Sequence, residues 1–284
     1  MAQNEVIITA DSTCDLPADI TADRGITIIP LSILLGDKEY LDGVDIKPQD
    51  IYAFAECENA LPKTAAVPPS RYYDVFEKAA NAGEKVVHIS LSSAISTSYQ
   101  NACIAAEDFD NVYVVDSKSL CTAMGLLVLK ACDMRDKGMD AKKIADKITK
   151  LVPKLRTGFV LDSLEYLHKG GRCSGIARFG ANVLAIKPSI AVNKDGAMEI
   201  AKKYRGKMDS VYRQYINDCF AEAGKADTSR VVVATSGGVD PMVIGFAKGV
   251  AEAKGFSEII TADAGCTISS HCGPKTLAIF YIKK

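Results

Sequence analysis

The sequence predicts an α/β protein of two domains, and three observations support this prediction. Short apolar runs alternate with amphipathic stretches through the first half of the chain, which is typical of a parallel sheet covered by helices. After about residue 155 the pattern changes to hairpin-like strands mixed with helices. The length of 284 residues is enough for two ordinary domains. We place them at residues 1–155 and 156–284.

The first half predicts four strands and six helices. Runs rich in Val and Ile indicate the strands, and helical spacing of apolar residues indicates the helices. The earliest helix carries Pro17 in its first turn and Gly25 after its end, the usual places for these residues. The strands are expected at 5–10, 26–35, 85–91 and 111–117, and the helices at 15–25, 45–59, 69–83, 96–108, 119–137 and 139–155.

The second half predicts a mixed sheet. Residues 156–185 are expected to form a strand, a helix, a glycine-rich turn and a second helix. Two alternating strands around Lys194, Asp195 and Gly196 indicate a hairpin. Helices at 208–223 and 241–254 each precede a strand, at 230–236 and 258–263. The stretch "SSHCGPKTLAIFYIKK" then predicts a turn and a last strand.

Composition excludes several classes of protein. The formal net charge of −1 gives no global field toward nucleic acid or an anionic membrane, although a peripheral membrane contact stays open. Nine scattered cysteines without a C-x-x-C pair are typical of reduced thiols. The first residues lack the charged and apolar regions of a signal peptide. We therefore expect a cytoplasmic protein.

The familiar signatures of enzymes are missing. There is no phosphate loop, no dinucleotide-binding glycine motif and no G-x-S-x-G elbow. The sequence contains serines and three histidines, so the residue types of a catalytic triad are present. His88, however, lies in an apolar strand and is expected to be a core residue. Cys266, His271 and Cys272 lack a second ligand pair, so we expect neither a metal nor a cofactor.

Basic residues gather in the middle of the chain. A solvated face explains most of them, and a protein partner is the better functional alternative because no nucleic-acid module accompanies them. The segment "KGGRCSG" is expected to be a tight turn between helices, which leaves its arginine unexplained. The basic residues are Lys154, Arg156, Lys169, Arg172 and Arg178.

Small polar clusters follow several predicted strands. The loops at the carboxyl ends of parallel strands converge on one crevice, so hydroxyls from these segments are expected to meet there. Neutral donors near a helix N-terminus suit a carboxylate, while a role as a helix cap or turn residue remains open for each single serine. The candidate ligands of a carboxylate are Thr64, Ser92, Ser93, Ser96 and His271.

These same segments resemble the DegV family of bacterial fatty-acid-binding proteins. "TADSTCDLP" is similar to the family's opening, "PKTAAVPPSRY" to its K-T-S-x-P-S segment, and "ISLSSAISTSYQNA" to S-S-x-L-S-G-T-Y-Q-x-A. "LDSLEYLHKGGRCS" resembles L-x-x-L-x-Y-L-x-K-G-G-R-x-S, and "IKPSIAVNKDGAM" and "HCGPKT" resemble the last two segments. The matches follow in order along almost the whole chain.

The resemblance implies a long-chain fatty acid such as palmitate, stearate or oleate, held between two α/β domains. It implies a carboxylate site at Thr64, Ser92 or Ser93, and His271, with Arg172 near the head group or near a partner. That partner is an ATP-dependent fatty acid kinase subunit, which makes acyl-phosphate for phospholipid synthesis. The chain itself is then a carrier and not an enzyme. A lipid hydrolase or acyltransferase, and a lipid sensor without a kinase, are the alternatives.

Two departures from the family pattern bear on the ligand. The family's S-G-T is Ser96-Thr97-Ser98 here, so a glycine is replaced by a threonine. The family's G-P-G-T is Gly273-Pro274-Lys275-Thr276, which places a lysine four residues after His271. Lys275 is expected either to pair with the acid or to point outward.

Overall fold

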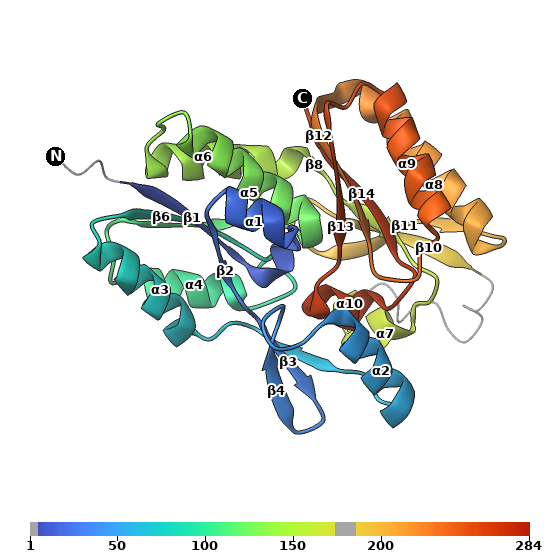
Figure 1. Ribbon diagram of the computed structural model, residues 1–284, viewed down its shortest axis with the longest axis horizontal. Helices are drawn as coiled ribbons and strands as arrows, with labels where there is room; N and C mark the ends of the chain where they lie inside the picture. The colour runs from blue at the N-terminus through green and yellow to red at the C-terminus, as the bar shows by residue number, and fades with distance from the viewer. Residues whose placement is uncertain (1–4, 174–185) are drawn as a thin grey trace.

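The first sheet is parallel and confirms the predicted fold class. The computed structural model describes residues 5–173 and 186–284, whose strands form three sheets (Figure 1). The first has the order β2-β1-β6-β7, with every neighbouring pair parallel. Its strands are β1 (Val6–Asp11), β2 (Ile26–Ile29), β6 (Lys85–Ser90) and β7 (Val112–Asp116).

Helices cover both faces of this sheet. Figure 1 shows α3 (Pro69–Asn81) and α4 (Ser98–Ala106) on one face and α5 (Cys121–Arg135) and α6 (Ala141–Leu151) on the other. Helix α6 buries residues at helical spacing on one side, as a surface helix does. Helix α5 is buried almost all round, because the second sheet packs against its other side.

The second sheet is mixed, as the sequence predicts for the second half. Its order is β11-β10-β9-β14-β12-β13, with β8 also pairing β14. Helices α8 (Met208–Ala221) and α9 (Pro241–Ala253) lie on the side away from α5 (Figure 1). The strands are β8 (Leu155–Arg156), β9 (Gly158–Val160), β10 (Lys187–Val192), β11 (Met198–Tyr204), β12 (Ala226–Thr235), β13 (Glu258–Asp263) and β14 (Leu277–Lys283).

The predicted hairpin is confirmed, since β10 and β11 pair in antiparallel register on either side of the expected turn. Every described strand from residue 155 onward belongs to this second sheet, and every earlier one to the other two. The division into domains at residue 155 stays a prediction.

The prediction of one strand over 26–35 is wrong. The chain leaves the first sheet after β2 and enters a small antiparallel sheet of order β4-β3-β5. Pro30 lies between the two strands, where it has no amide hydrogen to give to a ladder. This sheet consists of β3 (Ser32–Leu35), β4 (Lys38–Leu41) and β5 (Lys63–Ala65), with α2 (Pro48–Glu58) in the connection. The last two strands were not predicted, because they are too short to show a period.

Smaller corrections concern the predicted helices and one turn. The helix expected at 15–25 is limited to α1 (Ala18–Asp23), after a short 3-10 turn at Ser12–Cys14, and the helix expected from 96 begins at 98. The segment expected as a turn at 269–272 is instead the end of α10 (Cys266–Cys272). Helix α7 (Glu165–Gly170) precedes the glycine-rich segment. The helix expected after that segment, with Arg178, lies outside the described residues.

Candidate functional site

A cavity of about 410 Å³ lies where the three sheets meet. Its wall includes Thr64 from β5, the loop after β6, Arg172 after α7, and His271 from α10. The segments that the sequence analysis singled out therefore meet at one cavity. Of the predicted site residues, Thr64, Ser93, Ser96, Arg172 and His271 line the cavity.

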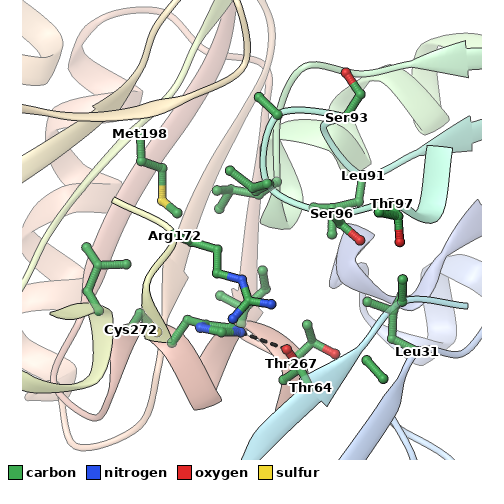
Figure 2. Close-up of a pocket in the computed structure, with 18 of the residues that line it drawn as sticks. Leu31, Thr64, Leu91, Ser93, Ser96, Thr97, Arg172, Met198, Thr267 and Cys272 are labelled. Carbon is green, nitrogen blue, oxygen red and sulfur yellow. Dashed lines mark hydrogen bonds between the residues drawn. The ribbon is translucent and has the colours of Figure 1, made fainter. Parts of the chain in front are cut away.

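A hydrogen bond joins two of these residues across 207 positions of sequence. The hydroxyl of Thr64 lies 2.8 Å from Nε2 of His271 (dashed line in Figure 2). Strand β5 holds Thr64 in place by pairing it with Ile33 of β3. Helix α10 carries His271 at its last turn. The pair links the small antiparallel sheet to the second half of the chain.

The imidazole of His271 is neutral at physiological pH. Burial disfavours its charged form, and the nearby positive charge of Arg172 acts in the same direction, so the pKa of His271 falls to about 4. Its other ring nitrogen, Nδ1, is buried and has no hydrogen-bond partner within residues 5–173 and 186–284. Gly170 lies against this nitrogen so closely that a Cβ there would overlap the ring. The first of the two adjacent glycines is thus explained by this close approach, and the second, Gly171, by its left-handed backbone conformation at the end of α7.

Arg172 is the one charged side chain among the described residues of the cavity wall. Its Nη1 donates to the carbonyl of Gly170 at 2.7 Å, which directs the guanidinium toward the cavity. Figure 2 shows the guanidinium pointing to the side where Thr64 lies. An anionic group in this cavity would find its counter-charge here.

The hydroxyls of the serines in the loop after β6 already have hydrogen-bond partners within the protein. Ser93 donates to Asp116 at 2.6 Å, and its hydroxyl points away from Arg172 (Figure 2). Ser96 pairs with Ser98 and accepts from the amide of Ser98, which supports the start of α4. These bonds agree with the alternative that each serine is a turn or cap residue, and a role as carboxylate ligand stays a prediction for both.

The positions of two residues decide expectations about them, and one of these, for Ser92, is wrong. Ser92 does not line the cavity: it is fully buried and donates to the carbonyl of Gly196 at 2.8 Å. Lys275 is also away from the cavity, with its side chain beside Gly238. The expectation that Lys275 points outward is the one that holds.

A buried polar cluster lies beneath this loop. Asp11, at the end of β1, accepts hydrogen bonds from Tyr72 Oη, Ser90 Oγ and the amide of Leu91 at 2.5, 2.7 and 2.7 Å. His88 lies 3.4 Å from the same carboxylate and bonds Thr9 through its other nitrogen. Burial alone would raise the pKa of Asp11, but the surrounding donors, His88 first, hold it below its usual value. The sequence expectation that His88 is a core residue agrees with this position.

The rest of the cavity wall is mainly apolar. A smaller cavity of about 30 Å³ adjoins this wall and shares Phe159, Leu120, Ile268 and Cys272 with it. Its lining also includes Ala234 and Ala278 from the second sheet. The remaining apolar residues of the main cavity include Leu31, Leu91, Ile95, Leu167 and Met198.

Sequence reasoning missed some residues of the wall. Thr267 lies one helical turn before His271, a spacing that places both on one face of a helix, but α10 was taken for a turn. Leu31 had no signal, because the break between β2 and β3 was not foreseen. Thr97, noted only as a replacement for a glycine, stands exposed at the cavity wall.

The arrangement supplies binding groups and lacks the parts of a triad. Thr64 and His271 are at the distance of a nucleophile and its base, yet no described residue offers a carboxylate to orient Nδ1 of His271. Within residues 5–173 and 186–284, no three His, Cys, Asp or Glu side chains gather where a metal ion could be held. In the same ranges, none of the helices is long and apolar enough to cross a bilayer.

The fold and the cavity together define a class of protein. It is an α/β protein with one parallel and one mixed sheet, and with an apolar cavity that carries a Thr–His pair and one arginine at the meeting of the sheets. A family model described as an uncharacterised protein of the DegV family matches residues 5–284. The chain belongs to the DegV family.

Relatives and solved structures agree with this assignment. A DegV domain-containing protein of Clostridium acetobutylicum is 33% identical over 284 residues, covering 99% of both chains. A structure reporting fatty acid binding of a DegV family protein from Thermus thermophilus has a TM-score of 0.88 at 26% identity, covering 99% of this chain and 100% of that one. A stearic acid-binding protein from Eubacterium ventriosum has a TM-score of 0.84 at 28% identity, covering 98% of both.

Proposed function

We propose that this protein binds a long-chain fatty acid in the 410 Å³ cavity. The carboxylate is placed at Thr64, His271 and Arg172, and the tail lies along the apolar wall toward Phe159. The observation that carries this proposal is the positive side chain of Arg172 beside a Thr–His pair in a cavity whose other described wall residues are uncharged and largely apolar. Two similar structures, described as fatty-acid-binding and stearic acid-binding, support it.

The Thr–His pair has a definite role in this proposal. A carboxylate can only accept hydrogen bonds, so Thr64 must use its single proton for the ligand. Its oxygen is then free to accept from Nε2–H of His271, which requires the tautomer with the proton on Nε2. The lowered pKa keeps the imidazole neutral, so that Arg172 supplies the positive charge.

The tail supplies most of the binding free energy. Burial of alkyl chain contributes roughly 0.8 kcal/mol per methylene, or on the order of 11 kcal/mol for a sixteen-carbon acid before association and ordering costs. The head-group contacts therefore mainly decide direction and the preference for an acid over other lipids. Ser93 and Ser96 contribute by shaping the loop, because the hydroxyl of Ser93 donates to Asp116 and that of Ser96 bonds Ser98.

We further propose that the bound acid is presented to an ATP-dependent fatty acid kinase subunit, which forms acyl-phosphate. The exposure of Arg172 and Thr97 supports this, since the head-group end of the cavity lies near the surface while the Phe159 end is buried. The carrier itself supplies no catalytic group in this scheme.

Native mass spectrometry of the purified protein, followed by organic extraction, tests the lipid proposal. We expect a one-to-one adduct with the mass of a C14–C18 acid. A protein that is bare and also fails to take up added palmitate contradicts it. Turnover of an ester by the chain alone would favour a lipid hydrolase. Acyl-phosphate formation on adding a fatty acid kinase subunit and ATP tests the partner, and binding without any such product would favour a sensor.

The head-group assignment predicts a selective effect of Thr64→Val. This change keeps the shape and removes the hydroxyl, so palmitate should bind about tenfold more weakly, the usual loss for a hydrogen bond to a charged group. Hexadecanol, which brings no carboxylate, is the matched ligand and should lose much less. Calorimetric titration of both ligands measures the difference. Equal losses for the acid and the alcohol would remove Thr64 from the carboxylate site.

A further inference from the structure

Helix α10 depends on a residue from the other half of the chain. It has only seven residues, yet Thr267, Ile268, His271 and Cys272 all line the cavity. The first amides of a helix have no partner within the helix and need acceptors from elsewhere. The residue before this helix is Gly265, which has no side chain to cap it.

Asp42 supplies the missing acceptors. Its carboxylate accepts from the amides of Cys266 and Thr267 at 2.8 and 3.3 Å, and from the hydroxyl of Thr267 at 2.6 Å. Asp42 follows β4 and is only 3% exposed, and more than 220 positions of sequence separate it from these donors. The carboxylate of Asp42 thus caps the N-terminus of α10 from a distant part of the sequence.

The same carboxylate is also linked to a second segment of the cavity wall. Ser12 donates to Asp42 at 2.9 Å and accepts from the amide of Leu31 at 3.1 Å. Leu31 also lines the cavity. One buried carboxylate therefore connects the start of α10 with the segment that carries Leu31.

Close packing leaves little freedom at this junction. A Cβ at Gly265 would lie 3.4 Å from Oδ1 of Asp42 and 2.7 Å from Oδ1 of Asp15, so the start of α10 rests directly against two carboxyl groups. His271 lies one turn after Thr267, so a shift of the first turn is passed on to the Thr64–His271 bond.

We propose that Asp42 is a positioning residue for the lipid site, which holds helix α10 so that His271 meets Thr64 at the head-group end of the cavity. The proposal rests on the proposed function only where lipid affinity is concerned. The geometry of His271 can be tested without any ligand.

The first test follows the three histidines by NMR during a pH titration of the lipid-free protein. In the parent, His271 should stay neutral down to about pH 4. Asp42→Asn keeps the shape and weakens the cap, so water reaches the ring and its titration should move toward the ordinary value by about one unit or more. Asp240→Asn is the matched control, because Asp240 caps α9 in the same way through Met242 but lies away from the cavity.

The second test compares palmitate with hexadecanol. Asp42→Asn should lower the preference for the acid about tenfold, whereas Asp240→Asn should leave it unchanged. If Asp42→Asn does not fold, Ser12→Ala removes one of the four donors and should shift both readouts in the same direction by less. A folded Asp42→Asn protein with unchanged His271 titration and unchanged acid preference overturns the proposal. A shifted titration without any lipid binding would instead overturn the lipid function alone.

Discussion

Asp11→Ala should be strongly destabilising, at about 3–5 kcal/mol of unfolding free energy. The change removes a fully buried carboxylate and leaves the donors of Tyr72, Ser90 and Leu91 without an acceptor, next to His88. A buried donor that loses its partner keeps its full desolvation cost. Urea denaturation followed by circular dichroism measures the loss.

Asp116→Ala is the control for this prediction. Asp116 ends β7 as Asp11 ends β1, and it accepts from Ser93 and from the amide of Lys118. It is only partly buried, so water can satisfy the donors that it leaves, and we expect a loss of about 1 kcal/mol. Comparable losses in the two variants would mean that the buried cluster is not a special source of stability.

Asp15→Asn should change how stability depends on pH. Burial, and then the negative charge of Asp42, raise the pKa of Asp15 from 3.8 to about 8. Neither carboxyl oxygen has a hydrogen-bond partner among the described residues; the thiol of Cys121 and the amide of Gly265 lie near enough only to offset this rise slightly. The groups that face Asp15 or share its groove are Asp42, Cys14, Cys121, Cys266, Cys272, Lys248 and Asp263.

The sign follows from proton binding in the two states. Below about pH 4 the carboxyl is protonated whether the chain is folded or unfolded. As the pH rises toward 8, the unfolded chain releases this proton while the folded protein keeps it, so the unfolding free energy falls over that range and then levels off. Asparagine does not titrate. The unfolding free energy of Asp15→Asn, measured relative to that of the parent, should therefore increase by on the order of 4 kcal/mol between pH 4 and pH 8.

Urea denaturation at a series of pH values measures this difference. His271 contributes in the opposite direction, because its pKa is lowered to about 4, so its contribution to stability is lost as the pH falls from 6.5. That contribution is common to both proteins and cancels in the comparison. Asp263→Asn, at an exposed position in the same groove, should run parallel to the parent. If the unfolding free energy of Asp15→Asn also ran parallel to that of the parent, the folded protein would already have lost the Asp15 proton by about pH 4, and the raised pKa would be wrong.

Local patterns in the sequence determined most of the architecture. The runs around Val86 and Val114 predicted buried parallel strands, and the spacing in 139–155 predicted a helix, because each reflects a periodicity that a few neighbouring residues decide. The resemblance of six segments to one family also identified Thr64, Arg172 and His271 as candidate site residues. All three line one cavity.

Only the tertiary structure decided which polar side chains bond within the fold and which face the cavity. Nothing local distinguishes Ser92, which is committed to Gly196, from Thr64, whose hydroxyl meets His271 at the cavity. Nor does any local pattern join Asp42 to Cys266, since their pairing depends on how the small antiparallel sheet lies against α10. Secondary structure follows from neighbours in sequence, whereas the partner of a buried hydroxyl or carboxylate is chosen by packing between distant segments. For this reason the sequence predicted the fold class and the segments that form the cavity. Only the structure decided which hydrogen-bond donors in those segments face the cavity.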